Sequence, residues 1–179
     1  MKTFALTLLC ALALPLMAAV GDIIPKETLP TVWFEGEQPK AWPNDDVWVF
    51  ECWATWCGPC IRAIPHMEEM WNKVKNEKIH IVGVNLEENK TPEQLRTFFT
   101  QQRVPPTYAM AIDKDNRFAR KVNIIGIPHA VAVRSGKIVW QGHPMTLTVE
   151  KLRSLTSATP IAPVAKPTTK PTCNCPKQH

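Results

Sequence analysis

The central part of the sequence lacks an appreciable net charge. The formal charge of the whole chain is +5, but four of its lysines lie near the two ends of the chain, namely Lys2, Lys166, Lys170 and Lys177. Setting these four aside leaves +1 for the remainder. A surface without a basic excess has little attraction for a phosphate backbone, so a nucleic-acid partner is not expected.

An apolar run of the length of an ordinary membrane span is also missing. The first long run ends at Leu14 and is followed by Pro15, whereas a transmembrane helix needs about 20 apolar residues. With Lys2 before it and the small residue Ala19 after it, this run predicts a signal peptide over residues 1–19. The alternative is an uncleaved anchor, which would hold the protein at a membrane. Both interpretations predict an extracytoplasmic location, which is the periplasm in a Gram-negative bacterium.

Ligand spacings for a structural metal site are equally scarce. Cys57 and Cys60 form a Cys-x-x-Cys pair, but the body of the chain has no second such pair and no His-x₃₋₅-His. Because a structural zinc site needs four ligands, the pair is interpreted as a redox dithiol. No lone cysteine in the body follows the Thr-x-x-Cys pattern of a peroxidatic site, which argues against a peroxidase.

The dithiol lies where the hydrophobic periodicity changes. Val47–Phe50 is a continuous apolar run that predicts a buried strand, whereas the residues after Cys57 have the three-and-four spacing of a helix, predicted over residues 59–75. Pro59 suits the first helical position, where its missing N–H needs no partner. Cys57 is therefore expected at a helix N-terminus, where free N–H groups and the helix dipole stabilise a thiolate.

This placement predicts thiol–disulfide exchange. The thiolate is the form of cysteine that attacks a disulfide, so Cys57 is the expected nucleophile and forms a mixed disulfide with a partner. Cys60, one turn inside the helix, then attacks Cys57 and releases the reduced partner. The redox-active disulfide is itself the reaction centre, so no cofactor is expected.

The residues around the pair resemble a known family. Trp56–Cys60, with Gly58 and Pro59 between the cysteines, is similar to the active-site signature of the thioredoxin superfamily, and Gly126–Pro128 is similar to its cis-proline loop. The apolar leader and the long insert between the first helix and that loop are more similar to the TlpA/ResA branch. The resemblance covers about residues 31–157.

The resemblance implies an α/β thioredoxin fold, in which helices flank a central mixed β-sheet, with an N-terminal extension and a helical insert. One thioredoxin-like domain is expected over residues 20–157. Apolar runs and turn residues predict further strands at 31–34, 79–84, 108–112, 129–134 and 137–140, and further helices after Thr91, at 118–122 and after Thr148.

Glu51 precedes the dithiol in the apolar strand and falls where the family carries a buried acid. Burial is expected to raise its pKa, so that it accepts and returns the proton of Cys60 during exchange. The alternatives are that strand alternation turns Glu51 toward water or that a basic residue pairs with it. The sequence also departs from the family, because Gly83 stands near the place of the lysine that often accompanies this acid.

The resemblance also implies roles for residues near the sulfurs. Pro128 is expected to be cis and to face them, while Ile127 offers backbone groups to an extended substrate segment. His129 is expected either to tune the sulfurs or touch the substrate, or to point away along its strand. Trp56 is expected to flank the site as a docking surface, and Cys52 to be a buried, unreactive thiol.

Residues 158–179 lack any apolar period and are rich in Pro, Thr and Lys, which predicts a disordered tail. Its Cys173 and Cys175 are weak candidates for a soft-metal site such as copper, or for a second redox pair that passes electrons to Cys57. A flexible end with incidental disulfides is the alternative.

Sequence and resemblance together predict an exported thiol-disulfide oxidoreductase that reduces the disulfides of exported proteins. Gly58 and Pro59 between the cysteines resemble the reducing thioredoxins. The alternatives are a disulfide oxidase or isomerase, and a copper-handling protein that uses the Cys173/Cys175 tail. Because an exported dithiol has no access to cytosolic reductants, a membrane electron donor is expected to re-reduce it.

Overall fold

The computed structural model describes residues 18–42, 45–103 and 105–157 of the chain. Its centre is a six-stranded sheet in the order β1-β4-β3-β2-β5-β6. Strands β2, β3 and β4 are parallel, whereas β1, β5 and β6 run antiparallel to their neighbours, which confirms the mixed sheet. In chain order, β1 to β6 span Val32–Glu35, Val47–Trp53, Ile79–Asn85, Ala109–Ile112, His129–Arg134 and Lys137–Gly142.

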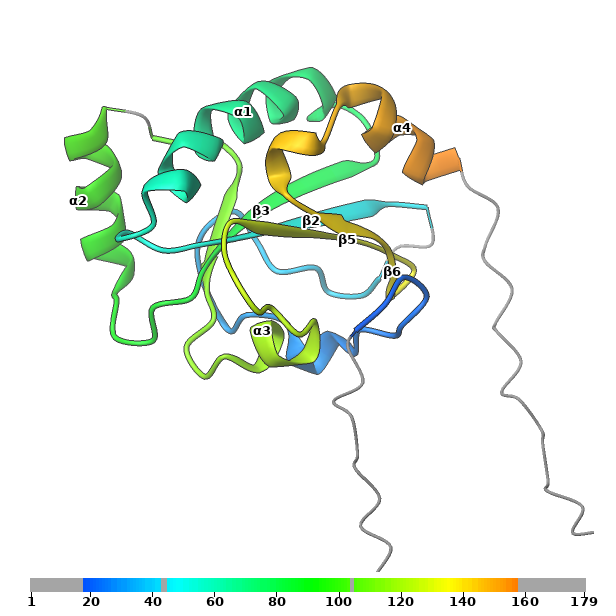
Figure 1. Cartoon of the computed structure of the whole chain (residues 1–179), viewed down its shortest axis with the longest axis horizontal. Coiled ribbons are helices and arrows are strands. Elements are labelled where there is room, and N and C mark those ends of the chain that lie inside the picture. Colours follow the sequence, from blue (N-terminus) through cyan, green and yellow to red (C-terminus); the bar gives the residue numbers. More distant parts are fainter. Residues whose placement is uncertain (1–17, 43–44, 104, 158–179) are drawn as a thin grey trace, which may run out of the picture.

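Helices cover both faces of this sheet (Figure 1). Helices α1 and α4 lie over one face and α3 over the other, while α2 lies at one end of the molecule beside the turn from β2 into α1. Together with β3 and β4, α2 and α3 make up the chain between α1 and the loop of Pro128. In chain order, α1 to α4 span Gly58–Val74, Pro92–Gln102, Arg117–Lys121 and Val149–Ser157, and two short 3₁₀ helices span Lys26–Thr28 and Pro144–Thr146.

Strand β2 is the middle of the core, and all of its residues are buried. Its side chains alternate between two apolar layers, as the pleat of a strand requires. Val49 and Trp53 belong to the layer formed with α1 and α4, whereas Phe50 and Cys52 belong to the layer formed with α3. Glu51 alternates with its neighbours in the same way and therefore points into the α1 layer, which also contains the two sulfurs.

The remaining helices and strands lie largely where the sequence predicts them, and local caps mark the starts of two helices. Thr91 and Gln94 form a reciprocal capping box at the start of α2, and Thr148 accepts a hydrogen bond from the backbone N–H of Lys151 in α4. The structure differs from the prediction in where individual elements begin and end. Helix α1 begins at Gly58, one residue earlier than expected, so proline is its second residue rather than its first.

The end of α4 is fixed to the far end of the sheet. Arg134, the last residue of β5, donates hydrogen bonds to the carbonyls of Leu155 at 3.0 Å and Thr156 at 2.8 Å. Arg134 pairs with Val47, which begins β2, whereas the dithiol follows the other end of β2. Helix α4 therefore ends at the end of the sheet opposite to the dithiol.

Two of the predicted segments fall largely or wholly outside the residues that the structure describes. The signal peptide, apart from its last two residues, and the tail with Cys173 and Cys175 lie outside the described residues, and the domain limits of 20–157 stay a prediction. Within the described ranges, no helix is long and apolar enough to cross a lipid bilayer.

Replacing Gly83 with alanine is expected to destabilise the protein by about 1–3 kcal/mol, the usual cost of overpacking a core. A Cβ at Gly83 would lie 2.5 Å from the sulfur of Met110, so this fully buried side chain has to shift. Urea unfolding measures the effect. Gly126→Ala is the matched control, since a Cβ there meets nothing within 4 Å, and an equal loss of stability in both variants would contradict the packing argument.

Candidate active site

Helix α1 holds the dithiol in its first turn. Cys57 is the N-cap residue, and its sulfur accepts a hydrogen bond from the backbone N–H of Cys60 at 3.2 Å. The two sulfurs form a disulfide of 2.09 Å, with Cα atoms 5.2 Å apart. Cys60 is fully buried and Cys57 is 4% exposed, so Cys57 is the more exposed of the two cysteines. The predicted position of the pair at a helix N-terminus is confirmed.

A partly buried carboxylate braces the turn that precedes Cys57. Glu87 accepts hydrogen bonds from the backbone N–H of Thr55 at 2.6 Å and from its hydroxyl at 3.0 Å. Asn85, the fully buried last residue of β3, donates to the same carboxylate at 3.2 Å. The turn is thereby tied to the sheet. Sequence analysis missed this brace, although an Asn-x-Glu pattern directly after an apolar strand was the available signal.

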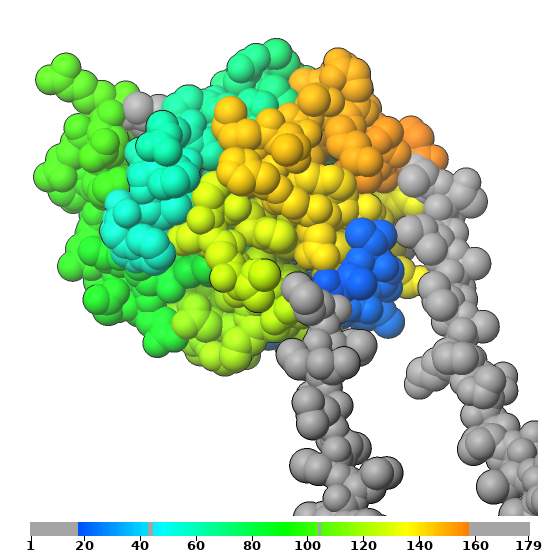
Figure 2. All heavy atoms as spheres, viewed as in Figure 1, coloured from blue at the N-terminus to red at the C-terminus, as the bar shows by residue number. Residues whose placement is uncertain are grey.

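Beside this turn lies a cavity of about 370 Å³ with a polar wall on α2. Thr55 lines it on the dithiol side, and Glu93, Gln94 and Thr97 line it on the α2 side. In the space-filling view, the cyan surface of the turn lies between the green surface of α2 and the yellow-green surface of the segment before β5 (Figure 2). The dithiol turn is therefore bordered by two segments that are distant in sequence.

The dithiol turn itself exposes apolar surface. Trp56 is 73% exposed beside Cys57, and Gly58 and Pro59 are exposed as well. On the loop that precedes β5, the Ile127–Pro128 peptide bond is cis, and Ile127 packs against both apolar layers.

The same loop also carries Ile125, which is 82% exposed and which sequence analysis did not single out. An apolar residue beside a glycine of the proline loop was the available signal. Ile125 is one of five large apolar side chains that are exposed among the described residues.

Glu51 is fully buried, and Tyr108 is its hydrogen-bond partner, with 3.4 Å between the tyrosine hydroxyl and Oε2. Burial raises the pKa of Glu51 to about 8, an effect that the hydrogen bond from Tyr108 partly offsets. The expected burial and raised pKa are confirmed. Neither alternative holds, because the side chain does not reach water and its partner is not a basic residue.

His129 and Cys52 lie on the other side of the sheet from Glu51. They pair across β2 and β5, one residue along from the pair of Glu51 and Ala130, so their side chains point into the opposite layer. Burial lowers the pKa of His129, while a hydrogen bond with Gln141 opposes this effect. Of the expectations for His129, the structure thus supports the one in which it points away from the sulfurs.

The expected burial of Cys52 is confirmed. Its side chain is fully buried, and burial raises its pKa well above the ordinary value, an effect to which the charges of Glu51 and Asp113 add. Because a thiol that stays protonated is a poor nucleophile, Cys52 is not a competitor for exchange.

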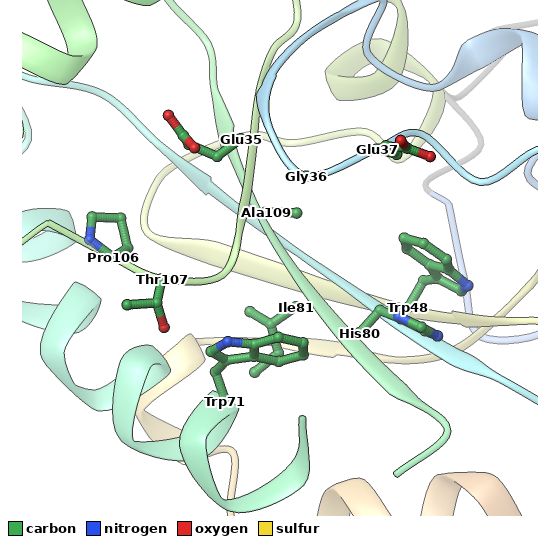
Figure 3. A pocket seen from close by; sticks show the side chains of 10 residues that line it. All are labelled: Glu35, Gly36, Glu37, Trp48, Trp71, His80, Ile81, Pro106, Thr107 and Ala109. Carbon is green, nitrogen blue, oxygen red and sulfur yellow. The ribbon is translucent and has the colours of Figure 1, made fainter. Parts of the chain in front are cut away.

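A second cavity, of about 300 Å³, lies where β2 and β3 begin, at the end of the sheet opposite to the dithiol (Figure 3). Trp48, Trp71 and Thr107 line it, together with His80. The ring of His80 stacks on Trp48 with centroids 4.1 Å apart, and its Nε2 lies 2.9 Å from Oδ2 of Asp46. These contacts give His80 a structural role.

The described part of the chain contains no group of three or more His, Cys, Asp and Glu residues placed to hold a metal ion. The weak candidates Cys173 and Cys175 lie outside it, so metal binding by the tail stays a prediction.

A cis-proline loop and a Cys-x-x-Cys pair at a helix N-terminus, on a mixed sheet of this order, define a thioredoxin-like protein. A sequence model of the AhpC/TSA family matches residues 20–142, and the chain belongs to this family.

Several curated relatives are thiol-disulfide oxidoreductases named ResA. The one from Bacillus thuringiensis subsp. konkukian is 27% identical over 88 residues, which cover 49% of each chain. The one from Geobacillus kaustophilus is 29% identical over 109 residues, which cover 60% of each chain. This chain thus spans about half to three fifths of the length of these two ResA proteins.

Solved structures support the fold. The crystal structure of StoA from Bacillus subtilis superimposes with a TM-score of 0.56 at 21% identity, covering 74% of this chain and 99% of that one. A putative thiol:disulfide interchange protein DsbE from Chlorobium tepidum gives a TM-score of 0.54 at 24% identity, covering 70% of this chain and 86% of that one. At these identities the likeness shows a common fold.

Proposed function

We propose that this protein is an exported thiol-disulfide oxidoreductase that reduces disulfides in other exported proteins. The observation that carries the proposal is the position of Cys57, which caps α1 next to the exposed ring of Trp56. The helix N-terminus favours the thiolate that exchange requires. The exposed ring of Trp56, next to Cys57 in the chain, gives a partner protein an apolar contact while its disulfide meets the sulfur.

The exchange proceeds in two steps. In the reduced protein, the Cys57 thiolate attacks a partner disulfide; a Cys57–partner S–S bond forms, and the other partner sulfur leaves as a thiolate that takes a proton from water. Cys60 then gives up its proton and attacks Cys57, forming the intramolecular disulfide and expelling the second partner thiolate. The partner is reduced by two electrons, and the protein is oxidised to the disulfide form seen in the structure.

Glu51 is the proposed base for Cys60. It points into the layer that contains the dithiol, and its pKa of about 8 lets it take up and return a proton near neutral pH. Ile127 and Pro128 face the partner segment in this proposal, and the backbone of Ile127 pairs with it as an added strand.

Export and the electron supply are also part of the proposal. The predicted signal peptide over residues 1–19 supports export to an oxidising compartment, where a membrane electron donor must regenerate the dithiol. The likeness to proteins named ResA supports the same class of activity.

The reduction potential of the Cys57–Cys60 pair tests the reducing direction. A potential near the thioredoxin value of about −270 mV is expected, because Gly58 and Pro59 are the residues that reducing thioredoxins carry between their cysteines. Equilibration with dithiothreitol buffers and thiol alkylation gives the value. A potential near about −120 mV, the value of a strong oxidant, would instead indicate a disulfide oxidase.

A further inference from the structure

The buried acid has one polar partner, and the two oxygens of its carboxylate are not equivalent. We propose that Tyr108 is a positioning residue of the exchange reaction: its hydroxyl holds Oε2 of Glu51, which leaves Oε1 as the atom that takes the proton of Cys60. This inference rests on the proposed function and specifies which oxygen of Glu51 receives the proton of Cys60.

The asymmetry of the carboxylate is visible in its contacts. The Tyr108 hydroxyl lies 3.4 Å from Oε2, whereas Oε1 is buried and has no hydrogen-bond partner among the described residues. Tyr108 is itself 1% exposed, so water does not compete for its hydroxyl. A buried oxygen without a donor is a costly arrangement, and it is relieved when that oxygen carries a proton.

The strands on either side of Glu51 provide no alternative partner. Its neighbours across β2 are Gly83 on β3 and Ala130 on β5, and neither has a polar side chain. Nor is there room for a longer residue at Gly83, where a Cβ would lie 2.5 Å from the sulfur of Met110 and 3.3 Å from Nε1 of Trp53. Tyr108, which directly precedes β4, thus reaches the carboxylate from a different element.

The other titratable groups near this pair are engaged elsewhere. On β2, Cys52 points into the opposite layer. On α1, Glu68 raises the pKa of Tyr108, but its carboxylate binds the backbone N–H of Thr107 at 2.8 Å and its hydroxyl at 2.6 Å. His66, also on α1, is engaged as well, with its Nε2 3.0 Å from the carbonyl oxygen of Leu147.

The chemistry follows from which partner holds the proton. Burial and the charge of Glu51 raise the pKa of Tyr108 well above its ordinary value, so the phenol stays protonated and acts as a donor. Its hydrogen bond stabilises ionised Glu51, which accepts the Cys60 proton on Oε1 as the Cys60 sulfur bonds to Cys57. After the partner thiolate leaves, Oε1 returns that proton to solvent.

Tyr108→Phe removes only the hydroxyl and therefore tests the proposal directly. The rate of partner release from the mixed disulfide is expected to rise with pH as Glu51 ionises. Without its donor, the carboxylate ionises less readily, so the midpoint of this profile is expected to move upward by about one pH unit, with a roughly tenfold slower release at pH 7. Thr107→Val is the matched control, because it removes the neighbouring hydroxyl, which binds Glu68 and not Glu51.

An independent readout uses the fact that the sequence contains a single tyrosine. In the oxidised protein labelled with ¹³Cζ-tyrosine, the one Tyr108 resonance is expected to titrate near the pKa of Glu51 and to lose this titration in Glu51→Gln. This measurement does not depend on activity, so it tests the hydrogen bond even if the protein reduces no disulfide.

The outcomes are distinguishable. A shifted release profile in Tyr108→Phe, an unshifted one in Thr107→Val and a titrating tyrosine resonance support the inference. The inference is overturned if the pH profile of partner release is unshifted in Tyr108→Phe, or if the Tyr108 resonance does not titrate with Glu51. Either result leaves the proposed function intact. Failure of the unmodified protein to reduce disulfides at any pH overturns the proposed function and, with it, the role of Tyr108 in exchange.

Discussion

In the Cys60→Ala variant, the reaction is expected to stop at the mixed disulfide between Cys57 and its partner. Cys57 can still attack, because it keeps its position as the N-cap residue of α1. The second sulfur, buried one turn inside the helix, is no longer present to expel the partner. Turnover is therefore expected to fall to the rate of uncatalysed exchange, while a covalent complex accumulates. Non-reducing electrophoresis and mass spectrometry would detect the complex and identify the partner.

Two further variants separate the roles of the cysteines. With Cys57 also changed to alanine, no complex is expected; capture that persists would mean that the nucleophile has been assigned wrongly. With Cys52 changed to alanine in the Cys60→Ala protein, capture is expected to continue, because Cys52 is buried in the opposite layer. This variant controls for the loss of a thiol as such.

Glu51→Gln is expected to make the protein more stable than the unmodified form at pH 8. Folding raises the pKa of Glu51 from 4.5 to about 8, so the folded state binds this proton more tightly than the unfolded state. The contribution of Glu51 to the free energy of unfolding is therefore fully present below pH 4.5. It is lost as the pH rises toward 8. At 1.36 kcal/mol per unit, the loss between pH 5 and pH 8 is on the order of 3 kcal/mol.

Urea unfolding of the oxidised protein at pH 5 and pH 8 measures this difference. The Glu51→Gln protein is expected to lose much less stability over this range, since it has no charge to bury. The exposed residue Glu37 offers a control, and Glu37→Gln is expected to follow the unmodified protein. Equal pH dependence of the Glu51→Gln variant and the unmodified protein would show that folding does not raise the pKa of Glu51.

The parts of the site that could be predicted from sequence depend on short-range signals. The dithiol, the start of α1 and the cap of α2 formed by Thr91 and Gln94 each involve residues within one helical turn of one another. The burial of Glu51 could be expected because its whole strand is apolar. The proline loop could be expected from the resemblance to the thioredoxin superfamily.

The missed contacts join residues that are distant in the chain. Tyr108 is 57 positions from Glu51, and Glu87 is 32 positions from Thr55. The Glu87 contact depends on how β3 is placed beside β2, and the Tyr108 contact depends also on how β4 is placed beside β3. No local pattern encodes such distances, because hydrogen-bond partners across a sheet are set by register rather than by sequence spacing.

The attachment of α4 to Arg134 has a consequence for how the protein can be tethered. The hydrogen bonds from this arginine hold Leu155 and Thr156 where β2 begins, whereas the dithiol follows the end of β2. A lipid surface, a carrier or an affinity handle joined after Ser157 would leave from the rear of the domain. Such an attachment would leave the sulfur at the opposite end free to meet incoming proteins.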